Sequence, residues 1–368
     1  MFHCLRSWLS AGEIVTTALA ETPLLEFAFV ALASDELFES AVNVICDLIH
    51  ETQELEDNMS VIQLIVPRVI ALRPLLATSK EDPDKMRGYT RIFSEAGETY
   101  RMLILQTAET FLPIVEAIAD CTAYSDLDIV PITFPFWWRL AHIVGKRPSV
   151  PSVLVEAYSA LVEIIIGHLH FPSDPDSMSN QEADDFRAFR HVMGDTLKDC
   201  CHVLGTDKCL MRAYDMIATG MAATGGDVSR VSWQDIEAPL FSMRSMGAEM
   251  DPSDDQVIPK VMDILPSLPG HPRVRYAALL VVSRYTEWTS RHPSYIPFQL
   301  QYISAGFDDA DIEVPAAAGV AMKYLCKDCK QVCCPHIRPV LSSSPSYKTD
   351  LAPPCSISCH IYRNCIHS

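Results

Sequence analysis

The sequence predicts an all-α protein, an α-solenoid of about seven HEAT-like antiparallel helix pairs followed by an irregular C-terminal tail. Apolar residues recur at spacings of three and four between Asp35 and Gln331, which is the periodicity of an amphipathic helix. The same stretch shows little of the alternation that marks a strand, and the whole chain contains only 14 glycines in 368 residues. Helix pairs that recur about every forty residues are typical of a solenoid, whose function depends on its surface.

The first helices are predicted from two apolar faces. One face contains Leu37, Ala41, Val44, Ile45 and Leu48, and the next contains Ile62, Ile65, Val66, Val69, Ile70 and Leu72. Residues that suit an N-cap or a first-turn position mark where the helices begin. In chain order these residues are Asp35, Asp82 with Pro83, Ser125 with Asp126, Ser149 with Pro151, Pro272 and Asp311.

These helix starts give the repeat length. Pro83 and Asp126 lie 43 residues apart, and Pro272 and Asp311 lie 39 residues apart. Both intervals are within or close to the range of about 40 to 47 residues for HEAT and armadillo repeats. A wider interval after Asp126 contains the polar stretch 172–182, which we interpret as an acidic surface loop inserted between two helices.

The chain divides into two parts at the end of the periodic region. Residues 1–330 form the predicted HEAT-repeat solenoid fragment. We expect it to be truncated at both ends, because residues 1–8 resemble the interior of a helix and the repeat pattern stops within a unit after Gln331. Residues 331–368 have no helical period and are rich in Cys, Pro and Ser, so we predict an irregular tail. The tail is either disordered or translated noncoding sequence, and sequencing the transcript across codons 331 and 332 distinguishes these possibilities.

The composition favours a protein of a reducing compartment with basic partners. The formal net charge is −18, whereas a protein that neutralises nucleic-acid phosphates needs an excess of Lys and Arg. We therefore predict no direct nucleic-acid binding and expect partners of the opposite charge. Most of the 13 cysteines stand singly at apolar helical positions, as Cys46 and Cys121 do, where a reduced thiol packs as a small hydrophobe.

The sequence carries neither a membrane span nor an enzyme motif. A membrane-spanning helix needs an uncharged apolar run of roughly 18 to 20 residues. Arg68, Arg139, Glu163 and Arg284 interrupt the best candidates, so we predict no membrane insertion. A glycine-rich phosphate loop, a Gly-x-Ser-x-Gly elbow and a His-Glu-x-x-His helix are all missing from the sequence. We therefore predict no enzyme activity, no catalytic residue and no cofactor.

A metal site in the tail remains an open alternative. Cys326 and Cys329 form a Cys-x-x-Cys pair, and thiolates with imidazoles make closed tetrahedral zinc sites. The further candidate ligands are Cys333, Cys334, His336, Cys355, Cys359 and His360. Their spacing is irregular and the Cys-x-x-Cys pair lies on a predicted helix, so we predict no bound metal. Stoichiometric zinc in the purified protein would favour the alternative.

The candidate protein-contact surface surrounds the acidic loop. Its residues are Asp174, Asp176, Glu182, Asp184, Asp185, Arg187 and Arg190. The carboxylates lie in a polar loop and a helix cap, without an apolar pocket to raise a pKa, which argues against acid–base catalysis. An electrostatic contact with a basic protein fits them better. Arg187 and Arg190, three residues apart on a helix, suit either a phosphate clamp or an exposed helix face.

We interpret two other groups of residues as structural elements rather than as binding sites. The aromatic cluster Phe134–Arg139 could form a ligand cage with its arginine, but we interpret it as core between repeats, where stacked helix pairs need large side chains. His168 and His170 are two residues apart and so do not share a helix face as metal ligands would. We expect them to end a helix before Phe171 and Pro172.

Several segments of the chain carry a family resemblance. They include Phe134–Leu140, Asp184–Arg190, Leu197–Asp199, Cys4–Trp8, Tyr89–Phe93 with Glu98, Ser232–Phe241, and Val274–Tyr276 with Glu287. Together these segments resemble the transportin-SR nuclear import receptors, and the fungal mRNA transport regulators most of all. The segments occur in the family's order over residues 4–330, and this ordered succession, rather than any one segment, makes the resemblance specific.

The resemblance implies an importin-β-like karyopherin made of HEAT repeats. Such receptors bind protein cargo such as Arg-Ser-rich RNA-binding proteins in the cytoplasm, dock on phenylalanine-glycine nucleoporins, and release cargo when the GTP-bound Ran GTPase binds in the nucleus. The resemblance therefore also implies shuttling between the nucleus and the cytoplasm. It covers the family's middle portion, without the N-terminal repeats that hold most of the Ran contact. The C-terminal repeats, which include the family's arginine-rich helix for phosphorylated Arg-Ser cargo, are also missing, so no cargo residue is carried over. A non-transport HEAT-repeat scaffold or regulatory subunit for protein assembly remains the alternative.

Overall fold

The computed structural model describes residues 2–11, 16–20, 22–225 and 230–330. Within these ranges the chain consists of α-helices, short 3-10 helices and turns, without a strand, and this confirms the predicted all-α class. The chain folds as two compact units. Unit 1 consists of Met1–His168 and Arg187–Gly205, and unit 2 consists of Leu169–Phe186 and Thr206–Ser368. The predicted division at residue 330 stays a prediction, because the tail lies outside the described residues.

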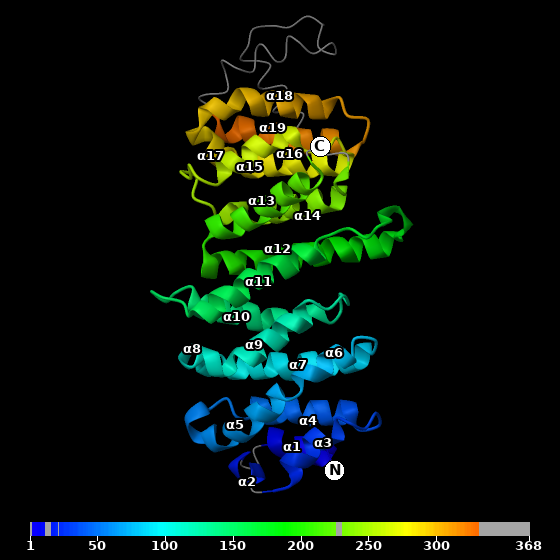
Figure 1. The fold of residues 1–368 in the computed structure, drawn as a ribbon, viewed down its shortest axis with the longest axis vertical. Coiled ribbons are helices and arrows are strands. Elements are labelled where there is room, and N and C mark those ends of the chain that lie inside the picture. Colours follow the sequence, from blue (N-terminus) through cyan, green and yellow to red (C-terminus); the bar gives the residue numbers. More distant parts are fainter. Residues whose placement is uncertain (1, 12–15, 21, 226–229, 331–368) are drawn as a thin grey trace, which may run out of the picture. The chain divides into compact units, whose positions relative to one another are not determined.

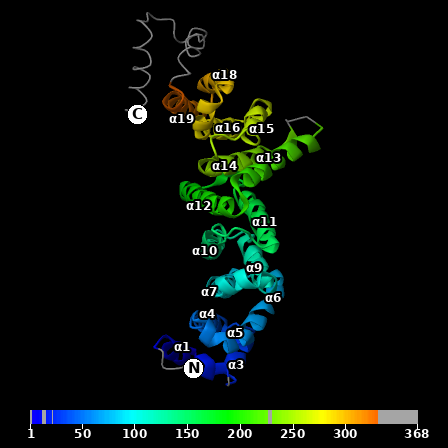
Figure 2. The ribbon, with the colours of Figure 1, turned by 90° about the vertical axis from the view of Figure 1, so that its left-hand side faces the viewer.

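Unit 1 contains two layers of helices (Figure 1, Figure 2). In the first layer α1, α4, α7 and α10 contact one another in succession, and in the second layer α5 contacts α2 and α9, and α9 contacts α11. The helices are α1 (Phe2–Ser10), α2 (Thr16–Ala20), α3 (Leu24–Ala31), α4 (Phe38–His50), α5 (Leu55–Ile70), α6 (Arg73–Thr78), α7 (Pro83–Thr99), α8 (Arg101–Gln106), α9 (Ala108–Thr122), α10 (Phe134–Val144), α11 (Ser152–His168) and most of α12 (Asn180–Leu204).

Unit 2 is built in the same manner. Helix α14 packs against α13 and α16, and α19 packs against α16 and α18. After the first turns of α12, its helices are α13 (Thr206–Ala223), α14 (Trp233–Met246), α15 (Ile258–Ile264), α16 (Pro272–Arg284), α17 (Thr286–Arg291), α18 (Ile296–Phe307) and α19 (Glu313–Asp328). Short 3-10 helices follow α14, α15 and α17, and another, η2 (Pro175–Ser177), precedes α12.

The helix starts show which sequence signals were reliable. Asp82 caps α7, since its Oδ1 accepts a hydrogen bond from the Lys85 amide at 3.1 Å and a proline occupies the first turn. The helix start predicted at residues 125–126 is wrong. Asp126 Oδ1 instead accepts a hydrogen bond from the Asp128 amide at 2.8 Å, which forms a turn, and α10 begins only after a 3-10 helix.

The core of unit 1 is centred on the aromatic cluster. Phe136 and Trp137 are buried, as predicted, and Trp137 lies edge-on to Tyr158 with ring centroids 5.4 Å apart. Trp137 Nε1 donates to Thr122 Oγ1 at 3.0 Å, and the Tyr158 hydroxyl donates to the Trp137 carbonyl oxygen at 2.8 Å. The core interpretation is wrong for Trp138, which is 54% exposed. The outcome fits a helix that buries only one face.

Helix α7 approaches its neighbours most closely at Gly97. A Cβ atom added there would lie 2.5 Å from Ile118 Cδ1 of α9 and 2.6 Å from Phe136 Cδ2 of α10. Neither distance leaves room for a methyl group, because carbon atoms in contact normally lie about 3.5 to 4.0 Å apart. Glycine at this position therefore allows three helices of unit 1 to pack together.

Contacts between neighbouring helix pairs recur at a regular spacing. Arg6 Nε donates to Asp47 Oδ2 at 2.5 Å across 41 residues of sequence. In unit 2 the Tyr285 hydroxyl donates to the Met243 carbonyl oxygen at 2.9 Å across 42 residues. These separations agree with the repeat interval predicted from the sequence. The number of repeats itself stays a prediction.

One described segment, Leu55–Thr78, is long and apolar enough to cross a bilayer by length and composition alone. In this structure it is divided into α5 and α6, and these two helices contact α2, α7 and α9 of the same unit. Its buried side chains include Val61, Ile65 and Val69, which lie on one face. Core helices of water-soluble proteins pass the same test, so the expected lack of membrane insertion stays a prediction.

Candidate functional site

The predicted loop 172–182 and the first turns of α12 that follow it form an exposed surface of unit 2, and we call residues 172–185 together the acidic loop. It contains five acidic residues and no basic residue. All five carboxylates of the sequence prediction, those of Asp174, Asp176, Glu182, Asp184 and Asp185, belong to exposed residues. An excess of charges of one sign on an exposed loop creates a negative potential that attracts cationic partners. The loop therefore suits the predicted electrostatic contact, which remains a prediction.

A capping box orders the end of the acidic loop where α12 begins. The Glu182 amide donates to Ser179 Oγ at 3.2 Å, and the Ser179 amide donates to Glu182 Oε2 at 2.7 Å. These hydrogen bonds lower the pKa of the Glu182 carboxyl, so the group stays charged at neutral pH. Gln181 Nε2 also donates to Asp185 Oδ1 at 2.8 Å.

The two arginines of the predicted surface lie in the part of α12 that belongs to unit 1, and they differ in exposure. Arg187 is exposed, whereas Arg190 is only 4% exposed. The proposed exposed helix face therefore does not include Arg190, because the helix turns this side chain inward. The spacing of three residues could not by itself distinguish the two positions, but Arg190 shares a face of α12 with the buried Met193 and Leu197.

A cluster of aromatic rings around one arginine anchors the acidic loop to unit 2. We call Phe171, Phe186, Trp233, His271 and Arg273 the Arg273 cluster. The Phe171 ring centroid lies 5.3 Å from that of Phe186 and 5.6 Å from that of Trp233. His271 stacks on Trp233 with the ring centroids 4.8 Å apart and the ring planes 1° from parallel. The sequence analysis missed this cluster, since its members come from three segments far apart in the chain.

Arg273 occupies the centre of the Arg273 cluster. Its Cζ lies 4.7 Å from the Phe171 ring centroid and 5.5 Å from the Trp233 centroid, within the range of a cation–π contact. Its Nη2 lies 3.6 Å from Asp176 Oδ1 in the acidic loop. Burial lowers the pKa of the neighbouring His271, and the positive charges of Arg273 and Arg275 lower it further. His271 is thus kept neutral at pH 7.

Two polar contacts hold the beginning of the acidic loop against α14. His170 Nε2 lies 3.3 Å from Asp235 Oδ1, and Gln234 Nε2 donates to the Pro172 carbonyl oxygen at 3.4 Å. The predicted helix end at His168 is confirmed, because α11 stops there and the chain turns toward unit 2. His170 therefore helps to position the beginning of the acidic loop.

A second acidic segment lies beside the same end of α16. The turn 308–313 contains four acidic residues and no basic residue. Arg275 Nη1 lies 2.6 Å from Asp309 Oδ2, and the Asp309 side chain is only 3% exposed. Since Arg273 contacts the acidic loop and Arg275 contacts this turn, both acidic segments lie near the N-terminal end of α16. We call the acidic loop and the turn 308–313 together the acidic edge.

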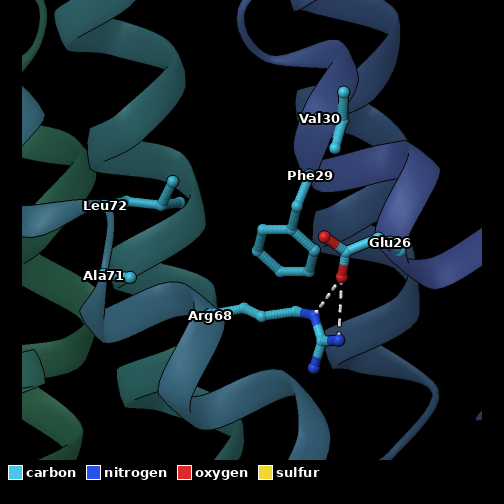
Figure 3. A pocket seen from close by; sticks show the side chains of 6 residues that line it. All are labelled: Glu26, Phe29, Val30, Arg68, Ala71 and Leu72. Carbon is cyan, nitrogen blue, oxygen red and sulfur yellow. Dashed lines mark hydrogen bonds and ion pairs between the residues drawn. The ribbon is translucent and has the colours of Figure 1, made fainter.

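Unit 1 contains a shallow groove of about 440 Å³ between α3 and α5 (Figure 3). Its lining consists of Glu26, Phe29, Val30, Arg68, Ala71 and Leu72. Arg68 donates from Nε and Nη2 to Glu26 Oε2 at 3.0 and 2.8 Å. The two charged groups in the groove thus pair with each other, and the rest of its lining is apolar.

The described residues contain no group of three or more His, Cys, Asp or Glu side chains placed to hold a metal ion. Of the zinc candidates, Cys329 is 1% exposed and its Sγ donates to the Thr286 carbonyl oxygen at 3.5 Å. Cys326 lies on α19, and Cys333, Cys334, His336, Cys355, Cys359 and His360 lie outside the described residues. Cys329 therefore serves the core of unit 2 as a small hydrophobe.

Comparisons with known proteins agree with this helical architecture. A family model described as the Transportin-3/Importin-13 second TPR domain matches residues 81–168, and one described as the third TPR domain matches residues 255–342. A solved structure titled "Importin13 cytosolic state" superposes with a TM-score of 0.71 at 20% sequence identity, over 83% of this chain and 38% of that one. This likeness confirms the predicted α-solenoid class.

Curated relatives extend the match over most of the chain. An uncharacterized protein of Schizosaccharomyces pombe is 38% identical over 363 residues, which is 94% of this chain and 38% of that protein. The mRNA transport regulator MTR10 of Saccharomyces cerevisiae is 32% identical over 90% of this chain and 36% of its own length. Importin-13 of Homo sapiens is 25% identical over 90% of this chain and 35% of its own length. The chain thus spans little more than a third of these relatives.

The helical-repeat fold and the named relatives, an mRNA transport regulator and importin-13, indicate the class of protein that the chain resembles, that of nuclear transport receptors. The comparisons support the importin-β-like karyopherin family for this chain, as a middle fragment that matches the second and third TPR domains described for transportin-3 and importin-13. The resemblance found in the sequence is thereby confirmed at the level of the family.

Proposed function

We propose that this chain is the part of a nuclear import receptor that contributes an acidic surface for a basic protein partner. The cargo is a protein such as an Arg-Ser-rich RNA-binding protein, which the complete receptor carries into the nucleus. Support comes from the family and from the acidic edge, whose two segments contain nine acidic residues and no basic residue. Electrostatic complementarity of this kind raises the association rate and selects partners of opposite charge.

The transport cycle follows from the same proposal. The receptor binds cargo in the cytoplasm, docks on phenylalanine-glycine nucleoporins, and releases cargo when GTP-bound Ran binds in the nucleus, so it shuttles between the two compartments. Release requires that bound Ran weakens the binding of cargo and that bound cargo weakens the binding of Ran. The size of this mutual effect is the coupling free energy between the two binding sites. The acidic edge serves the cargo side of this cycle.

The first test measures binding of a fluorescently labelled Arg-Ser-rich segment by anisotropy at two salt concentrations. Replacing Asp174, Asp184 and Asp185 by asparagine should weaken binding and reduce its dependence on salt, because three exposed charges of the acidic loop are lost. The matched control replaces Glu54, Glu56 and Asp57 of unit 1, which are also exposed, by their amides. An equal loss in both triple variants would show that only the net charge matters and would refute the role of the acidic loop.

The second test separates the transport receptor from a non-transport scaffold. Ran loaded with a nonhydrolysable GTP analogue is added to the complex of the complete receptor with the labelled segment, and Ran loaded with GDP serves as the control. Displacement by the GTP form alone supports the transport proposal. Binding that is insensitive to both forms favours a HEAT-repeat scaffold or regulatory subunit.

A further inference from the structure

We propose that the Arg273 cluster is an arginine-binding site that Arg273 itself occupies in this structure, and that an arginine of a basic partner segment enters it by displacing Arg273. The inference rests on the proposed function, because it concerns how the acidic edge recognises its partner. It adds a residue-level preference, for arginine over lysine, that negative charge alone does not provide.

The geometry is that of a guanidinium site. A guanidinium group is planar, stacks on aromatic faces and pairs with carboxylates. The Arg273 cluster provides two rings, Phe171 and Trp233, whose centroids lie 4.7 and 5.5 Å from Arg273 Cζ. The carboxylate of Asp176 lies 3.6 Å from Arg273 Nη2. The parallel stack of His271 on Trp233 helps to fix the orientation of the indole ring.

The present occupant is held loosely enough to exchange. Arg273 is 35% exposed and Asp176 is 92% exposed, so their ion pair is close to water and contributes little to stability. An incoming arginine would make the same cation–π and carboxylate contacts, so the exchange replaces each interaction with one of the same kind. Arg273 can turn into solvent without leaving a buried charge behind.

Displacement of Arg273 also changes the acidic loop. Arg273 neutralises one of the five acidic residues of the loop while it occupies the cluster. When a partner arginine takes its place, the carboxylate of Asp176 becomes part of the interface. The site thus places recognition of one arginine next to the exposed carboxylates of the acidic loop, and a partner with several basic residues gains from both.

Two peptides and a matched variant test the inference. Labelled peptides of equal length and charge contain either arginine or lysine as their basic residue, and their affinities are measured for the wild-type chain, Arg273→Ala and Arg291→Ala. Both substitutions remove one positive charge from unit 2, and Arg291 is exposed on α17, away from the Arg273 cluster. Arg273→Ala should bind the arginine peptide roughly threefold or more tightly than Arg291→Ala does, because the internal competitor is absent.

The lysine peptide should show no such difference between the two variants, since an ammonium group does not stack as a planar guanidinium does. Adding Asp176→Asn to Arg273→Ala should cancel the gain for arginine, and circular dichroism should show native helix content in every variant. An equal affinity of Arg273→Ala and Arg291→Ala for the arginine peptide overturns the inference, as does an equal gain for both peptides. If neither the wild-type chain nor any variant binds either peptide, the proposed basic partner is wrong as well.

Discussion

The close approach of three helices at Gly97 leads to a prediction of definite sign. Replacing Gly97 by alanine should stabilise an isolated helix by up to about 1 kcal/mol, because glycine is the poorer helix former. In unit 1 the added Cβ would lie 2.5 Å from Ile118 Cδ1 and 2.6 Å from Phe136 Cδ2. Each neighbour would have to move by about 1 Å to restore a normal contact.

The packing around Gly97 decides which effect is larger. Ile118 and Phe136 are 0% and 1% exposed, so neither can move into solvent. Overpacking of a buried site costs about 1 to 3 kcal/mol, and this site lies near the upper end because two neighbours are displaced together. After the gain in helix propensity is subtracted, Gly97→Ala should lower the free energy of unfolding by roughly 1 to 2 kcal/mol.

Urea denaturation followed by circular dichroism measures this change. The control is Gly167→Ala on α11 of the same unit, where an added Cβ would have no neighbour within 4 Å. Gly97→Ala should shift the midpoint to lower urea at unchanged slope, whereas Gly167→Ala should leave it unchanged or raise it. A rise in both variants would refute the packing argument.

A second-site change makes the prediction sharper. Ile118→Val removes the Cδ1 methyl group that the new Cβ would meet, at a cost of about 0.5 to 1.5 kcal/mol by itself. Combined with Gly97→Ala, it should destabilise by less than the sum of the two single changes. The rescue should be partial, because the contact with Phe136 remains.

Three further changes should have measurable effects on stability. Trp137→Ala should lower the free energy of unfolding of unit 1 by about 3 to 5 kcal/mol, read from urea midpoints, because it removes a fully buried ring. Tyr285→Phe should cost about 1 kcal/mol in unit 2 through loss of the hydrogen bond to the Met243 carbonyl oxygen, and an unchanged midpoint would contradict this. Burial raises the pKa of the Asp199 carboxyl to about 6, above its value near 4 in an unfolded chain. The native state therefore binds this proton more tightly than the unfolded state does. As a result, the free energy of unfolding should fall as the pH rises from about 4 to 6. Asp199→Asn should therefore have a smaller difference in urea midpoint between pH 4.5 and pH 7 than the wild type, and an identical difference would exclude Asp199 as a source.

The sequence predicted the features that depend on local spacing. The apolar spacing of three and four indicated helices, and Asp82 marked the start of α7, because a cap needs only residues next to it in the chain. The regular interval between helix starts indicated repeats, and contacts such as Arg6–Asp47 connect equivalent positions at that interval. The exposure of the five carboxylates in the acidic loop also followed from their polar surroundings.

The features that the sequence did not predict depend on contacts between distant segments. Phe171, Trp233 and Arg273 come together only because α14 and α16 pack side by side, and no local period relates these three positions. The exposure of Trp138 and the burial of Arg190 depend on the rotation of each helix about its own axis. A rotation of this kind moves a residue at the border of an apolar face from one side of that border to the other.

The contacts that join each helix pair to the next have a consequence for how chains of this kind change in evolution. Arg6–Asp47 and Tyr285–Met243 each connect positions about one repeat apart, so a whole repeat inserted outside such a pair would leave the pair on adjacent repeats. An insertion of a few residues within a helix would rotate everything after it and break these pairs. Gene duplication in whole-repeat steps is therefore the route by which such an array can lengthen or shorten while each surviving pair keeps its neighbour.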